Sequence, residues 1–144
     1  PRWVKRLKFI AACCLTLTFL TVVFVLAPYY PDEGGVVFLL TESSMLYHHL
    51  LNPMAALLSY LLLEREPHLP RSDVRWALLP TLAYAAVILP LNILRVIVGP
   101  YPFFEVYHQP VYVSVLWAVG LLGVNYLYAW LLWHLGGGRP RSAR

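Results

Sequence analysis

Apolar residues along this chain gather in four long runs, separated by short stretches that contain polar residues, proline and glycine. The runs extend from Leu7 to Ala27, from Ser44 to Leu63, from Trp76 to Val98 and from Val111 to Leu135. Each has about 20 residues or slightly more, enough at about 1.5 Å per residue for a helix to cross roughly 30 Å of hydrocarbon. The pattern predicts an all-α, polytopic membrane bundle with four transmembrane helices.

The composition agrees with a membrane protein and argues against an ordinary soluble domain. The chain is 60% hydrophobic and 12% charged, against roughly 25% charged residues in soluble proteins. Residues 1–135 are expected to form a single transmembrane domain, or the C-terminal part of a larger bundle that begins upstream of Pro1. The first run is long for a signal peptide and lacks a cleavage site. Residues 136–144, GGGRPRSAR, are expected to be a disordered cytoplasmic tail.

Lysine and arginine lie at alternate connections between the runs, and this predicts the orientation of the bundle. Ten of the 11 basic residues precede the first run, separate the second from the third, or follow the fourth. This is the positive-inside pattern of a chain with both termini in the cytoplasm. The net charge of +4 is therefore expected to face anionic membrane lipids, and no nucleic-acid partner is expected. The ten residues are Arg2, Lys5, Arg6, Lys8, Arg65, Arg71, Arg75, Arg139, Arg141 and Arg144.

The remaining basic residue, Arg95, lies inside the third run. A cation within a membrane span is a functional-site hypothesis by default. The third helix runs outward, so Asn92 and Arg95 are expected in its last turns. The second helix enters from outside, so His48 and Asn52 are expected at the same membrane depth. Spacings of three and four residues put the members of each pair on one helix face.

These four side chains are predicted to converge between the second and third helices. A nearby arginine favours the neutral imidazole that a general base requires, so His48 is the catalytic candidate. Arg95, Asn52 and Asn92 are expected to bind a substrate by positioning a carboxylate or an ester carbonyl.

The loop GPYPFFEVYHQP follows Arg95 and is expected to lie directly above this site. Tyr101 and Glu105 would form the mouth and complete the set of substrate-binding residues. Glu105 can also pair with Arg95 or orient a histidine, whereas His108 is expected to be a solvated loop residue.

Structural interpretations of the same residues stay open. Arg95 can extend its long side chain to the outer interface and bind nothing. One of the adjacent histidines, His48 and His49, is expected to bond to a loop carbonyl. The polar residues as a group can simply hold the helices together.

Neither a metal nor another cofactor is predicted. Zinc sites need three or four ligands at defined spacing, and the chain contains no HExxH or CxxC pattern. The rings of adjacent histidines diverge and cannot easily bind one ion. A glycine-rich phosphate loop and a GxSxG elbow are also missing from the sequence.

Several residues are expected to shape the bundle. Pro53 removes a backbone donor from the second helix and disturbs the carbonyl of His49, so it predicts a kink. Asn125 lies near the middle of the fourth run and predicts a hydrogen bond between helices. Gly120 and Gly123 are expected to permit close helix approach.

Two stretches resemble one family of membrane enzymes. LYHHLLNPMAALLSYLLLE is similar to the histidine-containing helix of the androgen-induced-type membrane hydrolases, in which a histidine stands five residues before a proline. His48 stands at that position relative to Pro53. GPYPFFEV resembles the YPF segment that opens the last helix of the family. The chain looks closer still to small bacterial relatives of unknown role, which implies a location in the bacterial inner membrane.

The resemblance implies an intramembrane threonine hydrolase that acts on esters of hydroxy fatty acids. Of the catalytic pair only the histidine has a counterpart, His48, because the threonine belongs to an earlier helix. A lipid-ester hydrolase is therefore the leading functional hypothesis. The alternatives are a binding or transport subunit for an anionic amphiphile or solute, and a structural membrane component.

Overall fold

In a computed structural model, residues 1–31, 34–63, 69–99 and 101–136 are described. Every regular element in these ranges is helical, which confirms the all-α prediction. The elements in chain order are α1 (Arg2–Thr21), η1 (Val22–Leu26), α2 (Ala27–Tyr29), α3 (Gly35–Thr41), η3 (Leu46–Leu51), α4 (Asn52–Leu58), η4 (Ser59–Leu63), α5 (Asp73–Trp76), α6 (Leu79–Ile93), η5 (Pro102–Phe104) and α7 (Val111–Leu135).

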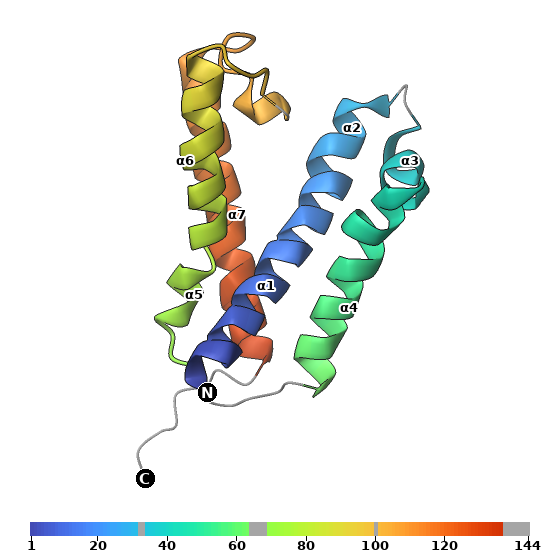
Figure 1. The fold of residues 1–144 in the computed structure, drawn as a ribbon, viewed down its shortest axis with the longest axis vertical. Helices are drawn as coiled ribbons and strands as arrows, with labels where there is room; N and C mark the ends of the chain where they lie inside the picture. The colour runs from blue at the N-terminus through green and yellow to red at the C-terminus, as the bar shows by residue number, and fades with distance from the viewer. Residues whose placement is uncertain (32–33, 64–68, 100, 137–144) are drawn as a thin grey trace.

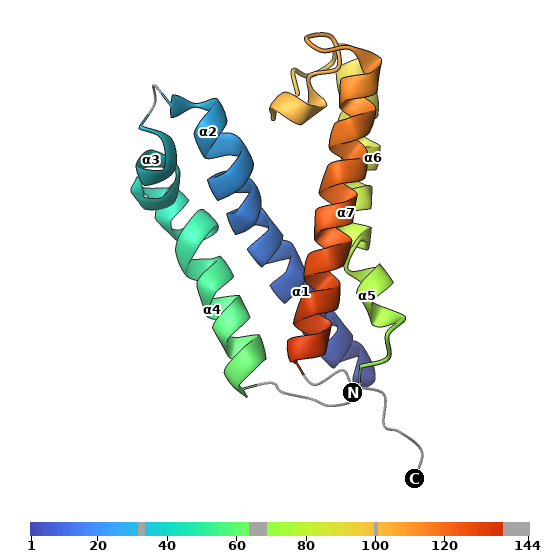
Figure 2. The same ribbon diagram turned by 180° about the vertical axis from the view of Figure 1, so that it is seen from behind.

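The long helices run alternately in opposite directions, so the start of α1 and the end of α7 lie at the same end of the bundle (Figures 1 and 2). This arrangement agrees with the alternation of basic residues along the sequence. The predicted cytoplasmic side is the end that carries the start of α1, which is the lower end in Figure 1.

Within the described ranges, three helices are long and apolar enough to cross a membrane. They extend over Arg2–Tyr29, Asp73–Ile93 and Val111–Leu135. The helix formed by η3, α4 and η4 is not among them, because two imidazoles and an amide make its first half more polar. The three helices fit a helical membrane bundle.

The second and third helices are shaped by their prolines. Before Pro53 the chain widens into the π-helical turns of η3, and the backbone N–H of Asn52 donates to the carbonyl of Tyr47, five residues earlier. The wider turn accommodates a ring that cannot continue the regular pattern. The third helix is interrupted between Trp76 and Leu79, because Pro80 lacks an N–H and occupies the first turn of α6.

The third helix also ends earlier than the apolar run predicts. It ends at Ile93 rather than at Val98, so the prediction that Arg95 lies inside a helix is wrong. By contrast, the fourth helix has the predicted bounds, Val111–Leu135.

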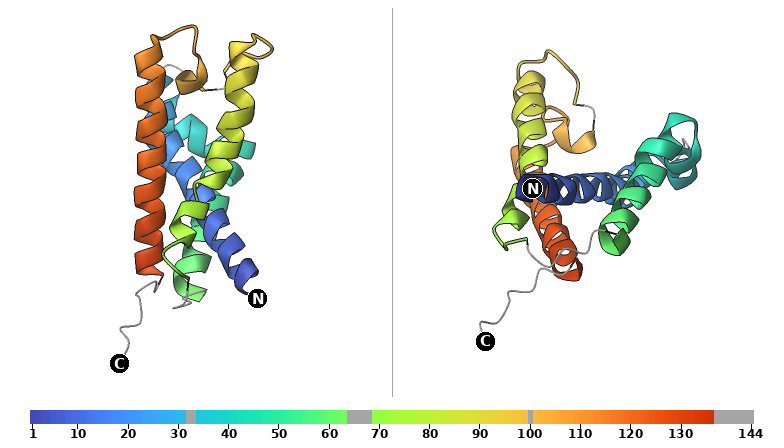
Figure 3. Two further views of the ribbon diagram at one scale, coloured as in Figure 1. Left: turned by 90° about the vertical axis from the view of Figure 1, so that its left-hand side faces the viewer. Right: turned by 60° about the horizontal axis from the view of Figure 1, so that its bottom comes forward.

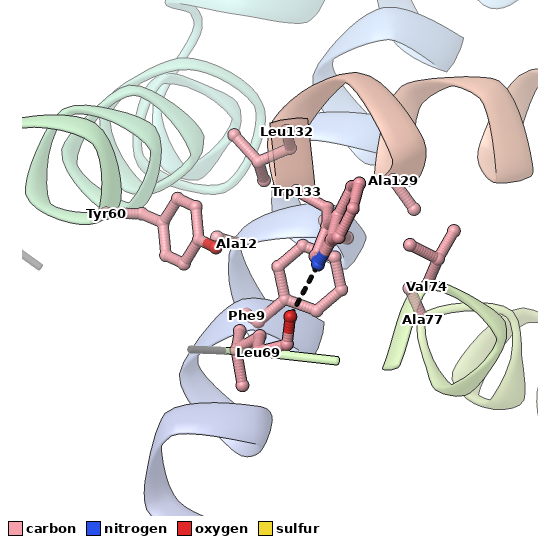
Figure 4. Close-up of a cluster of buried hydrophobic side chains, with 10 residues drawn as sticks. Phe9, Ala12, Tyr60, Leu69, Val74, Ala77, Ala129, Leu132 and Trp133 are labelled. Carbon is pink, nitrogen blue, oxygen red and sulfur yellow. Dashed lines mark hydrogen bonds between the residues drawn. The ribbon is translucent and has the colours of Figure 1, made fainter. Parts of the chain in front are cut away.

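The four long helices meet in a buried core at the end that carries the start of α1 (Figure 4). The indole N–H of Trp133 donates to the carbonyl oxygen of Leu69 at 2.8 Å. A Cβ at Gly136 would lie 2.7 Å from a ring carbon of Tyr60, so the end of α7 approaches the second helix closely. The buried residues of this core are Phe9, Ala12, Cys13, Tyr60, Leu69, Val74, Ala77, Ala129, Leu132 and Trp133.

An ion pair joins the first and third helices beside this core. The Asp73 side chain is completely buried, and its Oδ1 accepts bonds from Nη2 of Arg6 at 2.9 Å and from Nε at 3.1 Å. The Arg6 guanidinium also lies over the ring of Trp76, with its carbon 5.3 Å from the ring centroid. Arg6, one of the basic residues that predict the orientation of the bundle, therefore also takes part in the packing of its helices.

The other end of the bundle is more open. Figure 1 shows the end of α6 and the start of α7 spread away from α2 and α3. A smaller apolar cluster lies here, in which Phe103 of η5 packs with Val22 and Leu26 of the first helix. The loop after α6 therefore folds back over the bundle and contacts the first helix.

The remaining packing predictions have mixed outcomes. The amide nitrogen of Asn125 donates to Oγ1 of Thr81 at 2.8 Å, which confirms the interhelical bond. The prediction for Gly120 and Gly123 is wrong, because a Cβ at either position would meet nothing within 4 Å. Both glycines lie on an exposed face of α7.

Residues 137–144 of the predicted tail lie outside the described residues, whereas Gly136 caps α7 by donating to the carbonyl of Leu132 at 2.9 Å.

Candidate functional site

The end of α6 is closed by a pair of backbone bonds that place Arg95 in a left-handed conformation. The N–H of Val96 donates to the carbonyl of Leu91 at 2.9 Å, and the N–H of Arg95 donates to that of Asn92 at 2.9 Å. This is the Schellman pattern, whose left-handed position is usually occupied by glycine. Arg95 occupies it with a φ of 58°, at a cost of roughly 1–2 kcal/mol for a residue with a Cβ.

Asn92 holds the chain on both sides of this turn. Its side chain is buried, its Nδ2 donates to the carbonyl of Ile97 at 3.2 Å, and its Oδ1 accepts from the N–H of Val106 at 3.2 Å. These bonds tie the end of α6 to the following loop. Asn92 therefore supports the site, whereas its predicted contact with substrate stays a prediction.

The loop is packed tightly against the same turn. A Cβ at Gly99 would lie 2.7 Å from the carbonyl carbon of Phe104, so this position requires a residue without a side chain. Tyr101 stacks on Phe103 with 5.2 Å between ring centroids, and Phe103 contacts Trp117 of α7 at 5.8 Å. Tyr101 thus belongs to the aromatic support beneath the loop.

A cavity of about 220 Å³ lies where the end of α6 meets this loop. The Arg95 guanidinium lies over the ring of Tyr107, with its carbon 4.4 Å from the ring centroid. The Tyr107 hydroxyl donates to the carbonyl of Ile93 at 2.5 Å, which fixes the ring on which the cation rests. The cavity is lined by Asn92, Arg95, Val96, Ile97, Val98, Glu105, Tyr107 and His108.

The cavity contains a carboxylate as well as a cation. Oε2 of Glu105 lies 2.8 Å from Nδ1 of His108, and the Glu105 side chain is 24% exposed against 72% for His108. Within the described part of the chain, no ion pair joins Arg95 to Glu105. The site therefore presents separate positive and negative groups around one small cavity.

The structure divides the predicted constellation between two helix pairs. Arg95, Asn92 and Glu105 line one cavity. His48 and Asn52 are exposed on the second helix, which lies on the opposite side of α1 from α6 and α7 (Figures 1–3). The reason is that α1 lies between α4 and the pair formed by α6 and α7. The catalytic role of His48 stays a prediction.

The adjacent histidines have different environments. Nδ1 of His49 lies 2.8 Å from the carbonyl oxygen of Leu39, the residue that α3 places against the second helix. One histidine of the pair thus contacts a backbone carbonyl as predicted, but this carbonyl belongs to helix α3 and not to a loop. His48 is exposed.

Two polar lining residues were not assigned to the site from the sequence. Tyr107 and His108 were recognised as loop residues, but only the fold of the loop shows that both line the cavity. Their spacing from Glu105 gives no periodic signal. Among the described residues, no group of three or more His, Cys, Asp or Glu side chains is placed to hold a metal ion.

Comparisons with known protein families, with curated proteins and with solved structures give no match to this chain.

Proposed function

We propose that this chain is a four-span membrane protein that binds the anionic group of an amphiphile in the cavity at the outer end of α6. The observation that supports this most strongly is Arg95, an exposed arginine in a left-handed turn with its guanidinium stacked on Tyr107. An arginine that only extends toward water requires no such turn, and glycine would close the helix at lower cost.

Stacking prepares the guanidinium for an anion. A guanidinium held over an aromatic ring can still donate N–H groups at its edge, and these match a carboxylate or phosphate. Tyr107 is itself held by its bond to the carbonyl of Ile93. Less conformational freedom is therefore lost when the anion binds.

The cavity has the size of a headgroup rather than of a whole lipid. Its volume of about 220 Å³ is below the roughly 300–1,000 Å³ of pockets that enclose drug-sized ligands. Val96 and Val98 line it and are 66% and 74% exposed. An acyl chain would therefore extend from the cavity along this apolar exterior into the surrounding lipid.

The proposal includes the helix over Leu46–Leu63 as the fourth span. Its polar side chains His48 and Asn52 would lie near the outer interface, where water reaches them. The basic clusters then face the cytoplasm and the Arg95 cavity faces the opposite side.

A series of probes with one chain length tests the binding proposal. Decanoate and decyl phosphate are expected to bind the full chain, purified in a maltoside detergent, at least about tenfold more tightly than decanol, because a charge-assisted hydrogen bond contributes about 1.5–3 kcal/mol. Isothermal titration calorimetry measures the three affinities. Equal affinity for the charged and neutral probes would contradict the proposal.

The lipid-ester hydrolase remains a second candidate because His49 carries the structural bond and leaves the imidazole of His48 exposed. If His48 is a general base, replacing it by Ala should lower the turnover of fluorogenic acyl esters by about 10²–10⁴-fold. The matched control is His134→Ala, which removes an exposed imidazole near the end of α7, away from the Arg95 cavity, and should keep the turnover. Equal turnover by the unmodified chain and His48→Ala would sink the assignment.

A further inference from the structure

The Arg95 cavity carries two opposite charges that do not neutralise each other. Arg95 rests on the ring of Tyr107, and Glu105 contacts His108 instead of the guanidinium. A cavity that served only for an anion would gain nothing from a carboxylate in its wall, because like charges repel across a short distance. The carboxylate therefore needs its own explanation.

The position of Glu105 makes it available to a ligand. Its side chain is the more enclosed member of the pair, 24% exposed, while its histidine partner is 72% exposed and lies toward the outside. The imidazole of His108 contributes a positive charge only when it is protonated. Glu105 and Arg95 line the same cavity.

From this juxtaposition we infer that the amphiphile bound at Arg95 is zwitterionic, with its anionic group on Arg95 and an ammonium group on Glu105. The inference rests on the proposed function and specifies the ligand of the same cavity. A phosphate joined to an ammonium by a short link, as in an aminoalcohol phosphate headgroup, has the required pair of charges. Such a headgroup satisfies both side chains at once, whereas a purely anionic one leaves Glu105 opposed to it.

The test compares two short-chain phospholipids that have the same acyl chains, dihexanoyl phosphatidylethanolamine and dihexanoyl phosphatidylglycerol. The full chain in maltoside detergent is expected to bind the ethanolamine lipid at least about tenfold more tightly than the glycerol lipid. Glu105→Gln should remove this preference and leave or improve the affinity for phosphatidylglycerol. Glu42→Gln is the matched control, because Glu42 is an exposed carboxylate at the end of α3, and it should keep the preference.

The outcomes separate this inference from the proposed function. Binding of both lipids that depends on Arg95 but shows no preference for ethanolamine would overturn the inference alone. A preference that survives Glu105→Gln in protein with an unchanged unfolding temperature would also overturn it. Binding that is insensitive to Arg95→Met would overturn the proposed function as well. O-phosphoethanolamine, which has no acyl chain, tests whether the ligand is a lipid or a free headgroup compound. Weaker binding than that of the lipid supports a lipid ligand, and equal binding would overturn the proposal that the ligand is an amphiphile.

Discussion

Replacing Arg6 by Met is expected to lower the free energy of unfolding by about 3–5 kcal/mol, because it leaves the buried carboxylate of Asp73 without its cationic partner. The Asp73 side chain has no exposed surface, and both of its bonds from Arg6 reach the same oxygen, Oδ1. Its other oxygen, Oδ2, has no hydrogen-bond partner among the described residues. Removing Arg6 therefore leaves an unpaired buried charge beside the core.

The double variant Arg6→Met with Asp73→Asn should recover most of this loss, since an amide of the same shape carries no charge to strand. Arg2→Met is the matched control: it removes an exposed cation from the same end of α1 and should change the free energy of unfolding by less than about 0.5 kcal/mol. Unfolding by SDS titration in mixed micelles measures all four proteins. A loss below about 1 kcal/mol for Arg6→Met would contradict the role of this ion pair.

Arg6 illustrates what the charge pattern can and cannot predict. The clustering of Arg2, Lys5, Arg6 and Lys8 predicts which end of the first helix faces the cytoplasm, because that depends only on the sum of the charges near the membrane. It does not distinguish Arg6 from Arg2. The difference arises from a contact with Asp73, 67 residues later in the chain, and no local pattern encodes that distance.

The apolar runs predict the bounds of a helix well where the last apolar residue of the run is also the last residue of the helix. The fourth helix has the predicted bounds, and the interhelical bond of Asn125 is also confirmed. The third helix differs because the apolar residues continue from Ile93 to Val98 while the backbone turns away at Arg95. A Schellman closure without glycine gives no signal in hydropathy, so the end of α6 could not be predicted from the run.

The predicted common membrane depth of the candidate residues stays a prediction, and their predicted convergence is wrong. Topology placed His48 and Arg95 at a common level, and the opposite directions of the second and third helices agree with that (Figure 1). Their convergence required these two helices to be neighbours. In the structure α1 packs against the second helix and against α7, so Arg95 meets the loop residues Glu105 and Tyr107 instead.

The second large effect is expected at Arg95, where two variants separate backbone strain from ligand binding. Both Arg95→Gly and Arg95→Ala lose the stacking on Tyr107. Only alanine pays the free-energy cost of a left-handed conformation, roughly 1–2 kcal/mol for a residue with a Cβ. Glycine loses more conformational entropy on folding, and this reduces its advantage by about 0.4–1 kcal/mol. The glycine variant is therefore expected to be more stable than the alanine variant by about 0.5–1 kcal/mol in the same SDS titration. Equal stability, or a more stable alanine variant, would contradict the left-handed turn at Arg95.

Ligand binding should not follow that order of stability. Both variants lack the guanidinium, so both should lose about 10- to 100-fold in affinity for an anionic amphiphile, the equivalent of the 1.5–3 kcal/mol contributed by a charge-assisted hydrogen bond. Arg95→Lys retains the charge but not the planar guanidinium, and it should fall between the unmodified chain and Arg95→Gly.

The affinity of Arg95→Gly for decyl phosphate tests the binding site most directly, because this variant removes the guanidinium and keeps a helix closure that glycine favours. We expect the dissociation constant to rise by about 10- to 100-fold over that of the unmodified chain, with an unfolding transition that remains cooperative. An unchanged dissociation constant in the folded variant would show that Arg95 does not bind the anion and would contradict the proposed function.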